Sequence, residues 1–334
     1  MTEGRPVRVC VDAQGGDYAP REVLDGVARA LKADSALEIV LTGFEDIVVP
    51  FAAEHERVTS HPTTQVIRMS EHPASAVRSK GDSSIVVGCR LVKTGEADAF
   101  FSAGSTGACM AAATLVMGRI AGVARPAIAT IIPTPTTPVV LLDVGANADC
   151  KPEHLVAFAH MGSAYAQTVL AVSEPAVGLL NIGEEPTKGS ALAIEAHSLM
   201  DAHVPGFSGN VEGNSVLSGA VDVIVTDGFT GNVALKLLEG TSSALLGQVK
   251  EAMTSTFARR AAAAVLAPSL KAMKARLDPE NYGGAPLLGV KGVCIIGHGS
   301  SGSRAVAAGV GVAAQAVRGG LTGRIMSAVG HTQS

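Results

Sequence analysis

Six glycine-rich stretches hold most of the side chains in this sequence that could do chemistry, and each follows a short apolar run. They are residues 14–17, 103–107, 145–147, 183–189, 227–232 and 297–302. Where a strand leads into a helix, such a loop presents unpaired backbone N–H groups and the positive end of the helix dipole, which suit an anion such as phosphate. Because ligands of open α/β sheets bind outside the carboxyl ends of the strands, we expect these loops to cluster around an anionic substrate.

The polar side chains in and near these loops are the candidates for binding or polarising that substrate. They are Lys80, Asn147, Lys151, Lys188, Asn210, Glu212, Asp227, Asn232 and His298. Each also has a simpler interpretation. The lysines could be solvated loop residues, the Asn and Asp residues could cap helices or form turns, and His298 could pack within its own turn.

Several common catalytic motifs are absent from the sequence. It contains no G-x-x-x-x-G-K-[ST], no G-x-S-x-G and no H-E-x-x-H, which disfavours a P-loop, a hydrolase-type serine and a zinc protease site. Residues 297–302 match G-x-G-x-x-G, but a dinucleotide site also needs an acidic residue about 20 positions later, and none follows Glu280. Cys150 precedes a predicted helix start, which could lower its pKa, although a structural role is the more usual one.

The amino-acid composition also limits the functions that the chain could have. Apolar residues make up 47% of the 334 residues, enough for a large core, and the net charge of −4 with no Trp disfavours nucleic-acid binding. Five cysteines without C-x-x-C spacing fit a reducing cytoplasm. We expect neither a signal peptide nor a membrane-spanning segment, because no apolar run is long enough.

Short β-branched runs alternate with segments of helix length along the whole chain. Strands are predicted at residues 7–13, 99–102, 139–143, 177–182, 221–226 and 293–296. The helices are predicted to begin near Pro20, after Pro152, near Lys188 and after the loops at 103–107, 227–232 and 297–302. Such alternation indicates an α/β fold with a mostly parallel central sheet, because continuous apolar strands are buried on both faces. We interpret residues 1–334 as a single α/β domain.

Residues 252–277 form a segment without any acidic residue, and its apolar side chains recur at helical spacing. We expect a protruding helical segment at about residues 250–285, with two open interpretations. It is either a pair of ordinary surface helices or an amphipathic hairpin that lies on an anionic membrane surface. The candidate membrane contacts are Arg260, Leu266, Leu270, Lys271, Met273 and Lys274.

Eight motifs, in order along the chain, closely resemble the acyl-carrier-protein:phosphate acyltransferase family of phospholipid synthesis, the PlsX family. They are VDAQGGDYAP at 11–20, SAGSTGA at 102–108, LDVGANADCKPEHL at 142–155, GLLNIGEEPTKG at 178–189, GNVEG at 209–213, DVIVTDGFTGNVALK at 222–236, GGAPLLGVKG at 283–292 and IIGHGSSG at 295–302. Ser105, Gln14 and Asn214-Ser215 depart from the residues usual in that family.

The resemblance implies a reaction in which acyl-carrier protein and inorganic phosphate give acyl phosphate and free carrier protein. We expect no cofactor and assign no residue to a metal. The resemblance also implies a three-layer α/β/α fold similar to the phosphotransacetylase and isopropylmalate-dehydrogenase group, and a homodimer. The family works in the cytoplasm, in peripheral contact with the inner face of the membrane. There a membrane acyl-phosphate:glycerol-3-phosphate acyltransferase is the expected partner.

Within this chemistry phosphate is its own nucleophile, so the protein must position it and stabilise the oxyanion. We predict Lys188 as the phosphate or oxyanion charge, Asn232 as the donor to the carbonyl, and His298 as a proton donor. The further substrate- or phosphate-binding candidates are Asp12, Gly15, Gly16, Asp17, Lys80, Ser102, Gly104, Ser105, Thr106, Asn147, Lys151, Asn210, Glu212, Asp227, Gly228, Ser300 and Ser301. Two alternatives remain: an NAD(P)-dependent decarboxylating dehydrogenase on a related fold, and a non-catalytic scaffold for carrier protein.

Overall fold

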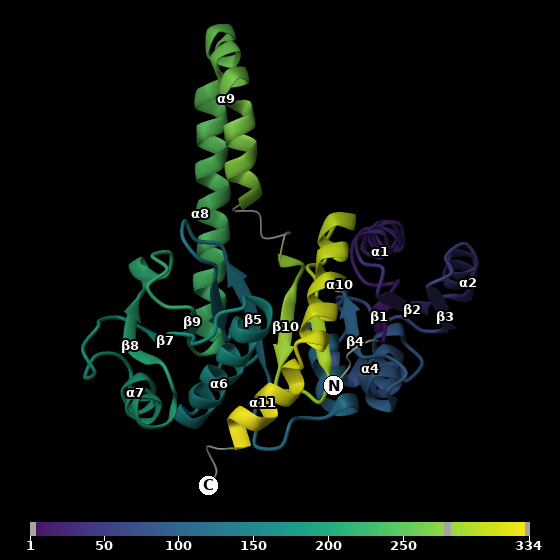
Figure 1. Ribbon diagram of the computed structural model, residues 1–334, viewed down its shortest axis with the longest axis horizontal. Coiled ribbons are helices and arrows are strands. Elements are labelled where there is room, and N and C mark those ends of the chain that lie inside the picture. The colour runs from purple at the N-terminus through teal and green to yellow at the C-terminus, as the bar shows by residue number, and fades with distance from the viewer. Residues whose placement is uncertain (1–4, 277–281, 331–334) are drawn as a thin grey trace.

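The computed structural model describes residues 5–276 and 282–330, apart from the side chains at positions 258, 262 and 272–276. Helices and strands alternate along most of the chain, as Figure 1 shows. The first half contains β1 (Val7–Asp12), α1 (Arg21–Ala33), β2 (Leu37–Gly43), α2 (Glu45–Ala53), β3 (Val58–Pro62), α3 (Pro73–Ser79), α4 (Ser84–Thr94), β4 (Ala99–Ser102), α5 (Thr106–Ala112), the π-helical turn η1 (Ala113–Met117), β5 (Ala127–Ile132), β6 (Val139–Leu142) and α6 (Pro152–Val169).

The second half completes the same sheet. It contains β7 (Val177–Asn181), α7 (Ala191–His203), β8 (Phe207–Glu212), the short 3-10 turn η2 (Gly213–Ser215), β9 (Val223–Val225), α8 (Gly228–Thr254), α9 (Phe257–Arg276), β10 (Ala285–Leu288), β11 (Val293–Ile296), α10 (Ser303–Arg318) and α11 (Leu321–Gly330). The predicted strands at 99–102 and 293–296 match β4 and β11, and the helix predicted near Lys188 begins three residues later, at Ala191.

The strands form one sheet in the order β3-β2-β1-β4-β11-β10-β5-β6-β9-β7-β8. The five strands from β3 to β11 are parallel to one another, and so are the four from β6 to β8. Between these groups the pairs β11/β10, β10/β5 and β5/β6 are antiparallel. Three reversals leave the two parallel groups running in opposite directions, so their carboxyl ends lie at opposite edges of the sheet.

Helices cover both faces of the sheet, which gives the predicted three-layer α/β/α architecture. Buried side chains of α1, α6, α7, α10 and α11 pack on one face together with Val9 and Val11 of β1. On the other face α3, α4 and α5 pack together with Cys10, which points the opposite way along the same strand. The apolar runs predicted as strands are therefore apolar because both of their faces are buried.

The hairpin of α8 and α9 extends away from the layered body, as the green helices in Figure 1 show. Only Gly228 and Gly231 of α8 are buried, and both lie in its first turn. A Cβ atom at Gly231 would overlap the carbonyl oxygen of Asp143, so this glycine lets the helix start close to the sheet. Among the described residues, no helix combines the length and hydropathy needed to cross a bilayer.

Candidate functional site

The six glycine-rich loops fall into two groups, one at each edge of the sheet. In the first group, the loops after β1, β4 and β11 meet: the Asp17 amide donates to the Gly299 carbonyl oxygen at 2.7 Å. The Gly297 amide likewise donates to the Ser102 carbonyl oxygen at 2.8 Å. In the second group, the loops after β6 and β9 meet, where the Gly228 amide donates to the Asn147 carbonyl oxygen at 2.7 Å.

The expectation that all six loops cluster around one substrate is therefore wrong. Parallel strands bring their carboxyl ends to a common edge, but the antiparallel pairs at β10 and β5 reverse the chain direction midway across the sheet. Lys188 and Asn232 follow strands of the second group, whereas His298 follows β11 in the first group. No hydrogen bond joins the two loop groups within the described ranges.

Buried aspartates occupy two of the loops predicted to bind an anion. Asp143 is fully buried and accepts from the amides of Ile128, Gly145, Ala146 and Asn147 at 2.7–3.2 Å. It also accepts the Asn147 side-chain Nδ2–H at 2.8 Å. Burial raises the pKa of the Asp143 carboxyl, and the N–H donors oppose that rise. These amides bind the protein's own carboxylate, a role of Asp143 that was not predicted from the sequence.

Asp12 plays a similar part in the first loop group. Its carboxylate accepts the Ser102 hydroxyl at 2.7 Å and the Gln14 amide at 2.9 Å. Asp12 and Ser102 are both buried, and burial raises the pKa of Asp12. A Cβ at Gly15 would lie 2.7 Å from both the Asp12 carboxylate and the Gly104 amide. Asp12, Gly15 and Ser102 thus position the loops, and their contact with substrate stays a prediction.

Several of the helix N-termini are capped by side chains. Asp227 caps α8 by accepting the Thr230 amide at 2.9 Å and the Thr230 hydroxyl at 2.8 Å. Glu22 accepts the first amide of α10, that of Ser303, at 2.7 Å, and this bond is the main cause that lowers the pKa of Glu22. At α5 the Ser105 hydroxyl accepts the Ala108 amide at 3.4 Å, which leaves the amides of Thr106 and Gly107 without a hydrogen bond to any described residue.

A cavity of about 700 Å³ opens beside the second loop group. Its walls come from β7, the start of α7, the end of β8 and the start of α8. The residues that line it are Leu155, Leu179, Leu180, Asn181, Ile182, Gly189, Ser190, Leu192, Ala193, Glu212, Gly213, Asn214, Thr226, Asp227 and Thr230. Two of the predicted substrate residues, Glu212 and Asp227, thus border a space large enough for a small-molecule substrate.

Lys188 and Asn232 each lie within two residues of a residue that lines this cavity, and both have unused polar groups. Lys188 immediately precedes two lining residues, and its backbone carbonyl accepts the Asn181 side-chain N–H at 3.0 Å. Its side chain is exposed and forms no ion pair with any described residue. Asn232 lies in the first turns of α8 against Gly145, and its half-buried amide makes no hydrogen bond with another described residue. Both groups can therefore still bind a ligand.

Asn210 is another candidate in the same half of the chain, and both polar atoms of its side-chain amide already have hydrogen-bond partners. Its Nδ2–H donates to the Glu185 carbonyl oxygen at 2.9 Å, and its Oδ1 lies 3.1 Å from Nδ1 of His197. Asn210 is buried, so in this structure it ties the turn before Lys188 to β8. Gly228 is buried as well, and a Cβ there would lie 2.8 Å from the Asp143 carboxylate.

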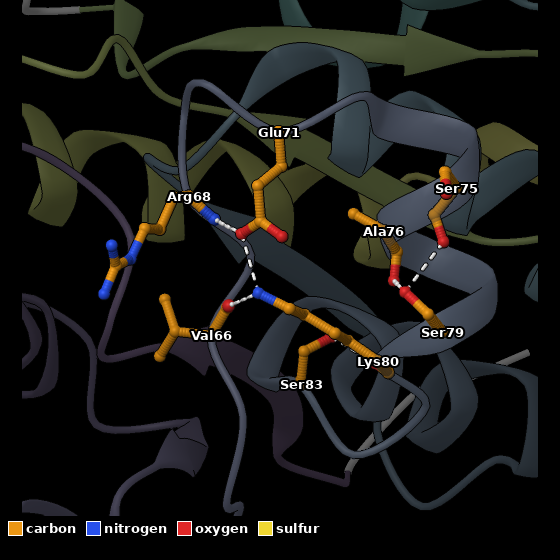
Figure 2. A network of polar contacts seen from close by, with 8 residues as sticks. All are labelled: Val66, Arg68, Glu71, Ser75, Ala76, Ser79, Lys80 and Ser83. Atoms are coloured by element: carbon orange, nitrogen blue, oxygen red, sulfur yellow. Dashed lines mark hydrogen bonds and ion pairs between the residues drawn. The ribbon is translucent and has the colours of Figure 1, made fainter.

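Lys80 lies in a polar network outside both loop groups, as Figure 2 shows. Its ammonium donates to the Val66 carbonyl oxygen and to the Glu71 carboxylate, each at 2.7 Å. The Arg68 amide donates to the same Glu71 oxygen at 2.6 Å, and this bond is the largest cause that lowers the pKa of Glu71. In this structure Lys80 connects the 66–71 loop to the end of α3, and its contact with phosphate stays a prediction.

The remaining candidates are placed as follows. His298 is exposed, and its Nδ1 accepts the Ser300 amide at 3.2 Å within the same turn. Three further candidates are exposed, namely Asp17, Ser300 and Lys151. Another three are half-buried, namely Gly16, Ser301 and Asn147.

Burial raises the pKa of the Cys150 thiol to about 11, so this cysteine is not an activated nucleophile.

The predicted membrane contacts all lie in α9. Arg260, Leu266 and Lys271 are exposed, and Leu270 is half-buried. The side chains of Met273 and Lys274 lie outside the described part of the structure.

Comparison with known proteins identifies the family of the chain. The sequence model of the family described as "Fatty acid synthesis protein" matches residues 7–324. A phosphate acyltransferase of Desulfitobacterium hafniense (strain Y51) is 49% identical over 94% of this chain and 95% of its own length. A phosphate acyltransferase of Bacillus pumilus is 47% identical over 90% of this chain and 91% of its own length.

Solved structures show the same fold at lower sequence similarity. The EutD phosphotransacetylase from Staphylococcus aureus superimposes with a TM-score of 0.60 at 17% identity, over 93% of this chain and 94% of that one. A phosphotransacetylase from Streptococcus pyogenes gives 0.61 at 15% identity, over 94% and 95%. These likenesses support the three-layer fold alone. With a family match over nearly its whole length and relatives almost half identical to it, the chain belongs to the phosphate acyltransferase family.

Proposed function

We propose that the chain transfers a fatty acyl group from an acyl-carrier-protein thioester to inorganic phosphate, as a step of phospholipid synthesis. The observation that carries this proposal is the pair of free polar groups on Lys188 and Asn232, an ammonium and an amide, each close in sequence to the lining of the cavity. The family's phosphate acyltransferases support the reaction class. They do not favour the dehydrogenase or the scaffold alternative.

The reaction needs no nucleophile from the protein. An oxygen of hydrogen phosphate bonds to the thioester carbonyl carbon, and the C–S electron pair then leaves with the sulfur. Hydrogen phosphate carries one proton, the acyl phosphate dianion carries none, and the carrier thiol needs one. The proton balance therefore closes without a proton from the protein, and the role of His298 as a proton donor stays a prediction.

Two residues have roles in this scheme. The Lys188 ammonium binds phosphate and offsets the charge on the attacking oxygen, and the Asn232 Nδ2–H donates to the oxyanion that forms at the carbonyl. Asp143 positions the loop that packs against Asn232, through the amides it accepts at Gly145, Ala146 and Asn147. The side chains that must act are free, while the backbone beneath them is held rigidly.

We also propose a homodimer, which the exposed face of α8 supports. Phe229, Val233 and Leu237 recur every fourth residue and are 67%, 51% and 68% exposed. Leu245 and Val249, further along α8, are exposed as well. An apolar stripe along a helix that projects from the body is typical of a surface that a second helix covers. The membrane contact of α9, on the anionic inner face, belongs to the same proposal.

A direct test mixes the purified protein with palmitoyl-carrier protein and orthophosphate and traps the product with hydroxylamine. The proposal predicts a hydroxamate that forms only when orthophosphate is added. Thioester cleavage at the same rate without phosphate would indicate a hydrolase and would reject the proposal. NAD(P)H fluorescence that rises on mixing with dialysed protein would support the dehydrogenase instead.

A further inference from the structure

The cavity beside the second loop group has an apolar interior. Leu155 and Leu179 are buried in its floor, and Leu180, Leu192 and Ala193 are half-buried in its walls. Its volume of about 700 Å³ lies within the range of pockets that enclose small molecules. These side chains offer van der Waals contact to a ligand. The lining also contains the polar residues Asn181, Ser190, Asn214, Thr226 and Thr230.

The charges around the cavity disfavour an anion inside it. The charged residues in its lining are Asp227 and Glu212, both acidic, and the lining contains neither lysine nor arginine. The Asp227 carboxylate is turned to the first turn of α8, and Glu212 accepts a bond from the Asn214 side chain at 3.4 Å. These two carboxylates make the lining less favourable for phosphate, or for the phosphate of a carrier arm, than for a neutral hydrocarbon.

The mouth of the cavity adjoins the groups proposed to react. Asn181 lines the cavity and holds the backbone of Lys188 through its 3.0 Å bond to the Lys188 carbonyl oxygen. Thr230 lines the opposite side and lies two residues before Asn232 on α8. A thioester between Lys188 and Asn232 would therefore have its hydrocarbon tail next to this opening.

We propose that this cavity holds the fatty acyl tail of the substrate and sets the preferred chain length. The inference rests on the proposed acyl transfer. Ala193, in the first turn of α7, is a small residue of the lining, so a larger side chain there would reduce the space, and its neighbour Leu192 lines the cavity as well. Each methylene of the tail that enters the cavity contributes about fourfold to binding.

The test compares octanoyl- and palmitoyl-carrier protein as substrates for Ala193→Phe, with Ile194→Phe as the matched control. Ile194 is the next residue of α7, is exposed and does not line the cavity. We expect Ala193→Phe to lower kcat/KM for the palmitoyl substrate by roughly 10- to 100-fold and to change the octanoyl value by less than about threefold. The control should keep the wild-type ratio. An unchanged ratio in Ala193→Phe would overturn the inference.

A second measurement separates this inference from the proposed function. Binding of cis-parinaric acid, a fluorescent fatty acid, reports the cavity without any turnover. We expect the wild type and Ile194→Phe to bind it and Ala193→Phe to bind it roughly 10-fold or more weakly. If none of the three proteins transfers the acyl group but all bind cis-parinaric acid in this pattern, the proposed reaction is rejected and the cavity remains a site for the fatty-acid tail. Equal binding by all three proteins would reject the cavity as the tail site.

Should Ala193→Phe fail to fold, as judged by its thermal melting, Leu192→Ala tests the same wall by enlarging the cavity. The expected result is a shift of the preferred substrate toward chains longer than in the wild type. A wild-type chain-length profile in folded Leu192→Ala would count against the proposal.

Discussion

Asn147 bonds twice to the carboxylate of Asp143, through its backbone N–H at 2.7 Å and its side-chain Nδ2–H at 2.8 Å. With three further amides on the same carboxylate, this pair fixes the loop that lies against the first turns of α8. The amides of a glycine-rich loop that could bind phosphate thus already donate to a carboxylate of the protein itself. The free amide of Asn232 lies next to that loop.

Asp143→Asn tests how much these hydrogen bonds to the Asp143 carboxylate stabilise the protein. The amide can accept through one oxygen only, and its NH₂ group would face the N–H donors of the loop. We expect the free energy of unfolding to fall by roughly 1–3 kcal/mol, measured by urea denaturation. Asp149→Asn is the matched control, because Asp149 is exposed and forms no hydrogen bond with a described residue. Equal stability of the two variants would contradict the role given to Asp143.

Glu22→Gln tests the contact between Glu22 and the start of α10 through its pH dependence. The pKa of Glu22 is lowered in the folded protein, so its stabilising effect is present above the unfolded-state pKa and is lost as the pH falls through the folded-state value. We expect the Tm of the variant to lie below that of the wild type at neutral pH and the difference to shrink at acid pH.

The matched control for that experiment is Glu56→Gln, since Glu56 is exposed and makes no hydrogen bond with a described residue. Its Tm should follow that of the wild type at both pH values. A Glu22→Gln deficit that persists in acid would mean that the carboxylate charge is not what stabilises this helix start.

Reversing the charges of Arg260, Lys271 and Lys274 to Glu tests the membrane contact of α9. Basic residues near an anionic bilayer each contribute about 1 kcal/mol. The triple variant should therefore lose co-sedimentation with vesicles that contain phosphatidylglycerol. Lys236→Glu, an exposed site on α8, should bind as the wild type does. Undiminished sedimentation of the triple variant would leave α8 and α9 as ordinary surface helices.

Much of the fold can be predicted from the sequence because strands buried on both faces leave a clear apolar run. β4 (AFFS) and β11 (VCII) are of this kind, and both match their predicted ranges. β3 and β8 lie at the two edges of the sheet and were not predicted. Their sequences contain the polar residues Ser60, His61 and Asn210, so neither strand is a continuous apolar run. β10 contains Pro286, which weakens a strand pattern.

The grouping of the loops could not be predicted in the same way. It depends on whether neighbouring strands pair parallel or antiparallel, and β5 and β10 fell outside the predicted strands. The sequence feature that could have indicated this grouping is Asp143. It stands at the end of an apolar run, as Asp12 stands at the end of β1. The two halves also share the pattern [ST]-x-G-x-T-G, at residues 102–107 and 226–231. Two such loops, each beside a buried aspartate, indicate two separate groups.

The most direct measurement follows labelled orthophosphate into acyl phosphate with palmitoyl-carrier protein as the donor. The variants are Lys188→Ala and Asn232→Ala, with Lys236→Ala as an exposed control lysine. Removing a donor to the reacting oxygens should slow label incorporation by roughly 10²–10³-fold in each of the first two. The control should match the wild type. Wild-type incorporation by Lys188→Ala and Asn232→Ala would place the chemistry elsewhere and contradict the account.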